Sequence, residues 1–209
     1  MTFRIEKMFI VRGFVLKKLL VVIIFLLFLH PEAFAEAKFQ VTVSIQPQVY
    51  FLEKIGGEKV NINLLVPAGR NPATYAPTPL QVAKLVKSNL YFSIGMPFEK
   101  RLMPKIKNIA RNTKIIKTQQ GIQKRQLEKH QDGDNRHDES NHSQIHSDSD
   151  HQTGYDPHIW LDPLLVKIQA ETIKKALSEY DPSEASFYEK NYLHFLSELE
   201  QLHLEIRAI

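Results

Sequence analysis

The stretch "KFQVTVSIQPQVYFLEKIGGEKVNINLLVP" (residues 38–67) combines two hydrophobic patterns. Residues 38–47 and 59–67 are rich in β-branched side chains that alternate with polar ones, which predicts two strands. Between them, residues 48–57 repeat an apolar side chain every third position and end in two glycines, which predicts a helix and its stop. A strand, a helix and a second strand in this order predict a parallel crossover unit.

The alternation of strands and helices continues after this unit. Strands are expected at 90–95 and 113–121, and helices at 79–88 and 97–110. Pro104 should kink the second of these helices or split it in two, because proline removes a helix hydrogen bond. The sequence therefore predicts an α/β fold, with a mainly parallel sheet covered by helices on both faces. Ligands of such sheets bind at the carboxyl ends of the strands.

Two further helices are expected at 163–180 and 182–209. The second carries an apolar stripe over about five turns, made of Tyr188, Tyr192, Leu196, Leu199, Leu202 and Ile206. A long amphipathic helix needs a surface to cover its apolar side. We therefore expect the chain to be a fragment or early truncation that lacks a second domain. The alternative is a complete protein whose last helix pairs with another copy.

The N-terminal residues 1–35 have the pattern of a secretory signal peptide. Basic residues precede an apolar run at 19–29, and an Ala-x-Ala motif predicts cleavage after Ala35. The alternative is an uncleaved anchor, but a membrane-spanning helix needs about 20 apolar residues. The protein is thus expected to be secreted into the periplasm.

Composition limits the kinds of site and partner. The whole chain has 27 Lys and Arg against 23 Asp and Glu, and residues 1–35 hold five and two of these. The mature chain is left with 22 and 21, a net charge of +1. Its charge therefore gives no support for binding nucleic acid. Because the chain has no Cys, any metal site must use His, Asp, Glu, backbone or water.

Residues 128–155 form an insert rich in His and Asp, with almost no aliphatic side chains, and we expect it to be disordered. Its histidines are His130, His137, His142, His146 and His151. Imidazole and carboxylate groups suit Zn²⁺, but the spacing is irregular. The insert is either a collector of metal ions with low specificity or a solvated polar linker.

His158 lies in "DPHIWLDP" (residues 156–163), a setting unlike that of the insert. Pro157 restricts the backbone before it, and the apolar residues after it can anchor the segment. Asp156 and Asp162 flank it and can orient one imidazole nitrogen. The sequence thus indicates a prepared metal ligand, or else a histidine that serves packing or capping.

Three other polar residues have two possible roles. Glu99 begins an expected helix after a strand, where it lies either near a cleft or as a first-turn carboxylate stabilised by the helix dipole. His194 and His203 are nine residues apart on the last helix, so they do not stack on one another. Both are expected at the surface or facing a partner.

Several segments together resemble a known family. In chain order they are "SIQP" (44–47), "YAPTP" (75–79), "FSIGMPFE" (92–99) and, most specific of all, "DPHIWLDP". With these segments, residues 38–209 resemble the periplasmic metal-binding proteins of ABC-type zinc and manganese uptake systems. The His-rich insert is typical of the zinc branch, the ZnuA-like proteins.

The resemblance implies two α/β lobes joined by a long rigid helix, with the metal between the lobes. Residues 36–181 correspond to the N-terminal lobe, and residues 182–209 begin the connecting helix. His158 corresponds to the second of two histidine ligands in this lobe. The first position is occupied by Ala73, which has no ligand atom. The resemblance places the remaining ligands in the second lobe, which we expect this chain to lack.

The resemblance implies a receptor that is not an enzyme. It would bind Zn²⁺, with Mn²⁺ less favoured, and deliver it to an ABC permease in the inner membrane. One alternative is a metal buffer or adhesin that acts through the insert. A weaker alternative is a zinc-dependent hydrolase with Asp156 or Glu99 as base, although no H-E-x-x-H motif occurs.

Overall fold

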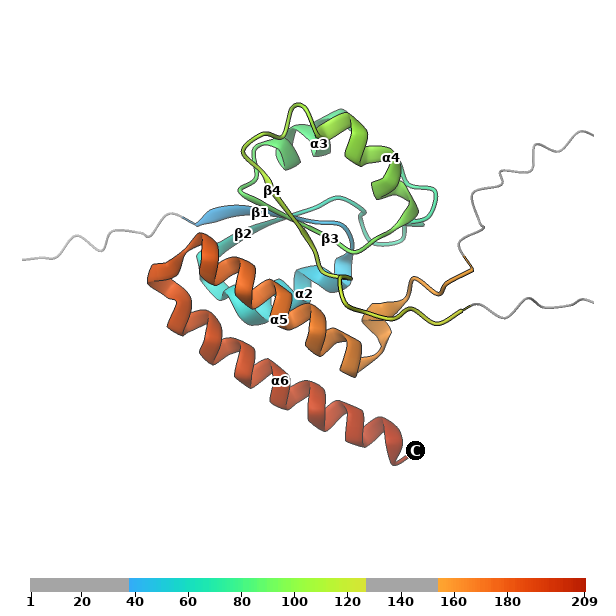
Figure 1. Ribbon diagram of the computed structural model, residues 1–209, viewed down its shortest axis with the longest axis vertical. Coiled ribbons are helices and arrows are strands. Elements are labelled where there is room, and N and C mark those ends of the chain that lie inside the picture. Colours follow the sequence, from blue (N-terminus) through green and yellow to red (C-terminus); the bar gives the residue numbers. More distant parts are fainter. Residues whose placement is uncertain (1–37, 127–153) are drawn as a thin grey trace, which may run out of the picture. The chain divides into compact units, whose positions relative to one another are not determined.

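The computed structural model describes residues 38–126 and 154–209, so the expected signal peptide at 1–35 lies outside it. These residues contain one parallel sheet in the order β2-β1-β3-β4 (Figure 1). Its strands are β1 (Phe39–Val43), β2 (Val60–Leu64), β3 (Leu90–Ser93) and β4 (Lys114–Lys117). The α/β fold class with a parallel sheet is therefore confirmed.

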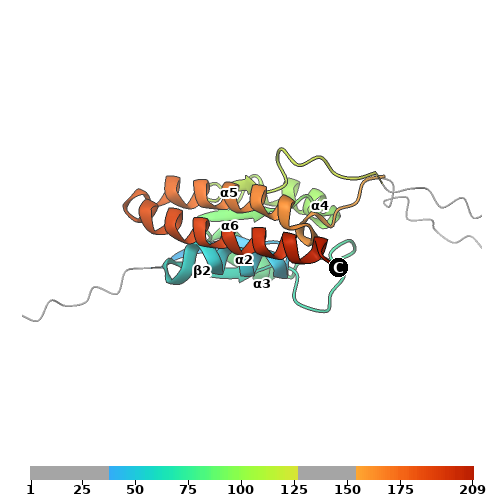
Figure 2. The same ribbon diagram turned by 90° about the horizontal axis from the view of Figure 1, so that it is seen from below.

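Helices cover both faces of the sheet. They are α2 (Gln46–Gly56), α3 (Pro79–Val86), α4 (Pro97–Ile106), α5 (Pro163–Tyr180) and α6 (Ala185–Arg207). Short 3₁₀ turns occur at η1 (Gly57–Lys59), η3 (Ile159–Leu161) and η4 (Pro182–Glu184). Figure 1 shows α3 and α4 on one face and α2, α5 and α6 on the other. In Figure 2 the long helices α5 and α6 run side by side.

The strand residues divide between two hydrophobic clusters. Val41, Val43 and Phe92 belong to the cluster shared with α2, α5 and α6. Tyr91, their neighbour in the alternation, belongs to the cluster shared with α3 and α4. This split follows from the strand period of two, which sends successive side chains to opposite faces.

Proline and capping residues set the starts of the helices. Thr78 caps α3 in a capping box with Gln81, and a proline follows at the first helical position. Pro104 was expected to kink or split a helix over 97–110. Instead α4 continues through Pro104 and ends two residues later, at Ile106. The proline thus lies in the last turn, where the lost hydrogen bond leaves no further helix to separate.

The apolar stripe of α6 is only partly buried. Tyr188, Phe195 and Leu199 are buried, whereas Leu202 and Ile206 are 45% and 49% exposed. The stripe therefore extends beyond the part of α6 that is packed against the fold. The reason is length, because α6 has 23 residues and α2, which it packs against, has only 11.

No helix in the described ranges 38–126 and 154–209 has both the length and the apolar character needed to cross a membrane.

Replacing Phe195 by Ala should destabilise the fold strongly. Its ring is 2% exposed, with its centroid 5.9 Å from that of Phe51 and 5.8 Å from that of Tyr50. We expect the free energy of unfolding to fall by about 3–5 kcal/mol. The measurement is urea unfolding followed by the fluorescence of Trp160, the only tryptophan.

Leu193→Ala is the matched control, since Leu193 lies on the same helix and is 56% exposed. Its effect should stay within about 0.5 kcal/mol. A loss below about 1 kcal/mol for Phe195→Ala would contradict the packing of α6 on α2.

Candidate metal site

His158 is held by Asp156 through two hydrogen bonds. The backbone N–H of His158 donates to Asp156 Oδ1 at 2.9 Å, and its Nδ1 lies 2.7 Å from the same oxygen. The sequence spacing of two residues makes this contact local. Because Nδ1 is engaged, Nε2 is the nitrogen left for another ligand, which is the usual preparation of a metal-binding histidine.

The turn that follows His158 is anchored in the core. Ile159 is 3% exposed, and its carbonyl accepts a hydrogen bond from Gln169 Nε2 of α5 at 3.3 Å. The rings of His158 and Trp160 meet edge to face with centroids 5.1 Å apart. The imidazole is thus fixed on one side although the side chain is 54% exposed.

Hydrogen bonding favours the charged form of Asp156. The backbone N–H of His158, followed by its imidazole, holds the pKa of the Asp156 carboxyl below its usual range. The carboxylate therefore stays ionised at neutral pH, where it favours a cation bound nearby. Asp162, the other flanking acid, has a different role. Its Oδ1 accepts from the backbone N–H of Leu164 at 2.9 Å and caps α5.

A pocket of about 420 Å³ opens beside His158. Its walls come from η3, the first turn of α5 and the last turns of α6. Its polar lining consists of Arg125, Asp156, His158, Asp162, His203 and Arg207. His203 was expected at the surface or facing a partner, and the structure makes it half-buried in the wall of this pocket. His194 does lie at the surface, with Nε2 3.4 Å from Glu198 Oε1.

The expected insert at 128–155 is described only at its edge. Gln126 and Tyr155 form an antiparallel bridge, and the backbone N–H of Asp156 donates to the Arg125 carbonyl at 2.8 Å. The chain therefore leaves and returns beside Asp156. The five insert histidines lie outside the described residues: His130, His137, His142, His146 and His151.

Ala73 lies in a loop whose shape does not depend on a ligand. Its N–H donates to Asn71 Oδ1 at 2.9 Å, and its carbonyl accepts from Arg101 Nη2 at 3.2 Å. In the same loop Tyr75 donates its hydroxyl to Gln81 Oε1 at 2.9 Å. Neighbouring groups thus keep the loop in place while position 73 offers only a methyl group.

Glu99 is buried in the fold and does not lie at a cleft rim. The side chain is 4% exposed, and the backbone N–H groups of Ile94 and Gly95 donate to its carboxylate at 2.9 and 2.7 Å. The hydroxyl of Ser44 donates to it as well. Burial raises the pKa of the Glu99 carboxyl, and these hydrogen bonds partly oppose that rise. Glu99 therefore joins the ends of β1 and β3 as a first-turn carboxylate of α4.

The polar network around Glu99 was not predicted from the sequence. Gln48 accepts the N–H of Ser44 at 3.0 Å and reaches Thr118, while Tyr91 lies 2.9 Å from the Ser44 hydroxyl. Burial raises the pKa of Tyr91 well above its usual value. These groups fill the ends of the central strands, where parallel sheets often bind ligands. The sequence signal that could have revealed this network is the presence of polar residues such as Ser44 and Gln48 in otherwise apolar segments.

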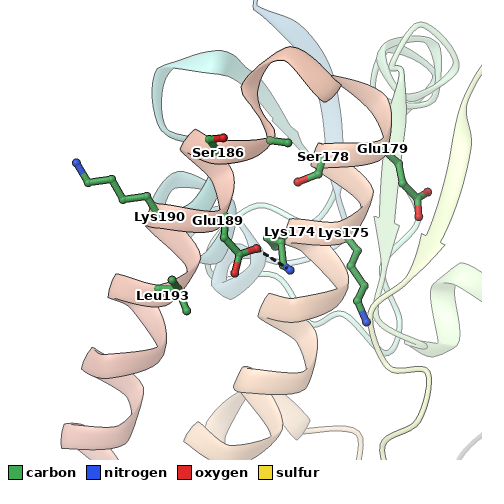
Figure 3. A pocket seen from close by; sticks show the side chains of 9 residues that line it. Lys174, Lys175, Ser178, Glu179, Ser186, Glu189, Lys190 and Leu193 are labelled. Carbon is green, nitrogen blue, oxygen red and sulfur yellow. Dashed lines mark ion pairs between the residues drawn. The ribbon is translucent and has the colours of Figure 1, made fainter.

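A second pocket, of about 830 Å³, lies between α5 and α6 and is shown in Figure 3. Three lysines and two glutamates line it, and Lys174 Nζ forms an ion pair with Glu189 Oε2 at 2.8 Å. It contains no histidine. Within residues 38–126 and 154–209, no three His, Asp or Glu side chains gather as a metal cluster. The pocket beside His158 is therefore the candidate, with an incomplete ligand set.

Comparison with known proteins identifies the family. The sequence pattern of "Zinc-uptake complex component A periplasmic" (ZnuA) matches residues 41–209. The chain belongs to this family. The resemblance read from "DPHIWLDP" is thereby confirmed, and the family is one of substrate-binding proteins and not of enzymes.

Two curated relatives show the range of the family. The chain is 32% identical to "Metal ABC transporter substrate-binding lipoprotein SloC" of Streptococcus mutans over 72% of its own length and 45% of SloC. It is 26% identical to "Zinc-binding lipoprotein AdcA" of Streptococcus pneumoniae over 80% of its own length and 32% of AdcA. The chain thus spans less than half the length of these two relatives.

Solved structures agree with the fold. A zinc-bound deletion mutant of ZnuA is 41% identical, with a TM-score of 0.66, and the match covers 81% of this chain and 57% of that one. Zinc-bound AdcA from Streptococcus pneumoniae is 22% identical, with a TM-score of 0.63 over 81% and 32% of the two chains, and supports the fold alone.

Replacing Glu99 by Gln should destabilise the protein in a pH-dependent way. The amide of glutamine has only one acceptor oxygen, so a buried donor loses its partner and the free energy of unfolding falls by about 1–3 kcal/mol. Folding raises the pKa of Glu99, so its carboxyl group stabilises the folded protein fully at a pH below the pKa of the unfolded chain. This stabilisation is lost as the pH rises through the pKa of Glu99 in the folded protein. The difference between wild type and variant should therefore be smaller at about pH 8 than at about pH 4, measured by urea unfolding.

The control is Glu53→Gln, at an exposed position of α2. It should change the free energy of unfolding by under about 0.5 kcal/mol at either pH. A difference for Glu99→Gln that grew with pH would show that the ionised carboxylate is the favoured form.

Proposed function

We propose that this chain carries the metal-recognising lobe of an extracytoplasmic receptor, which binds Zn²⁺ and delivers it to an ABC permease in the inner membrane. One observation carries the proposal: His158 Nδ1 lies 2.7 Å from the ionised carboxylate of Asp156, beside an open pocket. In this arrangement the carboxylate sets the tautomer and orientation of the ring, and Nε2 binds the ion.

Nitrogen ligands favour Zn²⁺ over Mn²⁺, which prefers oxygen ligands. The family contains relatives named for each ion, AdcA for zinc and PsaA of Streptococcus pneumoniae for manganese. We assign Zn²⁺ to this chain because its main ligand is an imidazole and its insert supplies five more. Mn²⁺ is the less favoured ion.

The site would lie outside the cytoplasm. Residues 1–35 read as a cleaved signal peptide, and SloC and AdcA are named as lipoproteins. The mature net charge of +1 gives no reason to propose nucleic acid as a partner. The partner we propose is the permease, with the metal ion as cargo.

The lobe would be residues 36–181, and residues 182–209 would begin the helix that leads to a second lobe. The second lobe would complete the coordination of an ion held first by His158. Binding across two lobes can favour a closed state, because the ion has more ligands there than in the open one. The permease would then recognise the closed state.

A metal buffer acting through the insert is the second candidate. The pairing of Gln126 with Tyr155 favours it, because this bridge ties both ends of the insert beside the pocket. A hydrolase has no such support. Glu99 is buried and fully hydrogen-bonded, and Asp156 is engaged by His158.

The first test is zinc titration by calorimetry on the protein, on His158→Ala and on a deletion of residues 130–151. We expect one site that survives the deletion and weakens at least about tenfold in His158→Ala, because a first ligand is lost. If His158→Ala changes nothing and the deletion removes all binding, the buffer replaces the receptor as the function.

Ala73→His tests the other ligand position of the lobe. The loop is held by Asn71 and Arg101 through backbone atoms of residue 73, so the substitution leaves these contacts available. We expect zinc affinity to rise by about tenfold or more, because a second imidazole joins the site. Ala76→His, at an exposed position of the same loop, is the control, and its zinc affinity should stay within roughly twofold of the wild-type value. Equal effects of both variants would contradict a specific ligand position at 73.

A further inference from the structure

Gln169 is a fully buried polar residue on a face of α5 that is otherwise apolar. Its side chain is 0% exposed, and Val166, Ala170 and Ile173 on the same face are buried in the cluster against the sheet. Burying a carboxamide costs free energy unless its polar atoms are hydrogen-bonded. Packing alone therefore does not explain a glutamine at this position.

The two ends of the Gln169 carboxamide differ in their hydrogen bonding. Its Nε2 donates to the carbonyl of Ile159 at 3.3 Å, whereas its Oε1 is buried without a hydrogen-bond partner among residues 38–126 and 154–209. A methionine would fill a similar volume here and leave no polar atom of its own unpaired. The contact that distinguishes glutamine from an apolar residue at this position is thus the bond to Ile159.

The Ile159 carbonyl belongs to the turn that follows the imidazole of His158. The side chain of Ile159 is buried in the cluster shared with α3 and α4, whereas α5 packs on the other face of the sheet. Other bonds of the turn are local, from the N–H of Ile159 to the Pro157 carbonyl at 2.8 Å and from the N–H of Leu161 to the His158 carbonyl at 3.1 Å. These local bonds shape the turn, and the bond from Gln169 fixes it relative to α5.

From these observations we propose that Gln169 is a positioning residue for metal binding, which holds the turn at Ile159 so that the imidazole of His158 faces its pocket. It acts through the backbone and does not touch the ion. On the other side of the imidazole, the N–H of Asp156 donates to the Arg125 carbonyl at 2.8 Å, so the segment is held at both ends. The inference rests on the proposed function, since it assumes that His158 binds the ion.

Gln169→Met is the first variant to test, because it removes the bond and nearly keeps the side-chain volume. The midpoint of urea unfolding should change little, since the lost bond to Ile159 is offset by the removal of a buried unpaired oxygen. Zinc affinity should still fall by about three- to tenfold, less than the effect of about ten- to hundredfold for a group bonded directly to a ligand. The affinity is measured by titrating the full chain with ZnCl₂ and following the NMR ring signals of His158. Zinc held by the insert then does not enter the result.

A second readout needs no metal. The ¹⁵N shifts of the His158 ring report which nitrogen carries the proton, and in the wild type this should be Nδ1, which is bonded to Asp156. In Gln169→Met we expect both ring shifts to move toward the averaged values of a free imidazole, because the turn is no longer fixed to α5.

Two further variants separate positioning from stability. Gln169→Asn keeps the amide but is one methylene shorter, so it cannot maintain the bond to Ile159. It should reproduce the loss of zinc affinity and also lower the unfolding midpoint, because it leaves a cavity. Ile173 lies one turn further along α5 and is 0% exposed. Ile173→Val should lower the midpoint while zinc affinity stays within about twofold of the wild-type value.

The remaining outcomes separate this inference from the proposed function. Unchanged zinc affinity in Gln169→Met overturns the role of Gln169 and leaves the proposed function intact. An affinity that falls in parallel with stability across the three variants also overturns it, because the effect would then be one of packing. If the His158 signals of the wild type do not respond to zinc, the proposed function fails, and the role of Gln169 in metal binding fails with it.

Discussion

The parallel sheet has two apolar faces, and the burial of both determines where every other part of the lobe lies. Strands at the centre of such a sheet cannot leave either face in water without exposing rows of valine, leucine and phenylalanine. Helices α3 and α4 cover one face, and α2 and α5 cover the other, with α6 packed over these two. The candidate metal site is a consequence of this arrangement. The pocket forms where the start of α5 and the end of α6 meet.

A chain of contacts connects the core to His158. Ile173 and Ala170 bury α5 against the sheet, and Gln169 of the same helix donates to the carbonyl of Ile159. That bond holds η3, and the turn before η3 carries the imidazole. Asp156 then fixes the ring by a contact across two residues. His158, the proposed ligand, is thus held rigidly at its base although it stands at the surface.

Hydrogen bonds close the carboxyl ends of the central strands. In many parallel sheets the ends of the central strands are open to a ligand. Here Ser44, Gln48, Tyr91 and Glu99 fill that position with bonds among themselves and to the backbone. A buried carboxylate is stable there because two N–H groups and a hydroxyl replace the water it has lost. The candidate metal site lies instead in the loops beyond the strands.

The sequence by itself determined the local structure of this protein. Alternation in 38–67 specified the crossover unit, because the strand and helix periods are properties of neighbouring residues. The sequence likewise placed two carboxylates beside His158, and the structure shows that Asp156 makes the hydrogen bond. Only the tertiary structure decided that His203 lines the same pocket as His158, that Glu99 is buried, and that Leu202 and Ile206 stay exposed. Each of these depends on which helix side meets which neighbour. Helix lengths and the packing of α6 on α2 and α5 fix that choice, and periodicity along one segment carries no information about it.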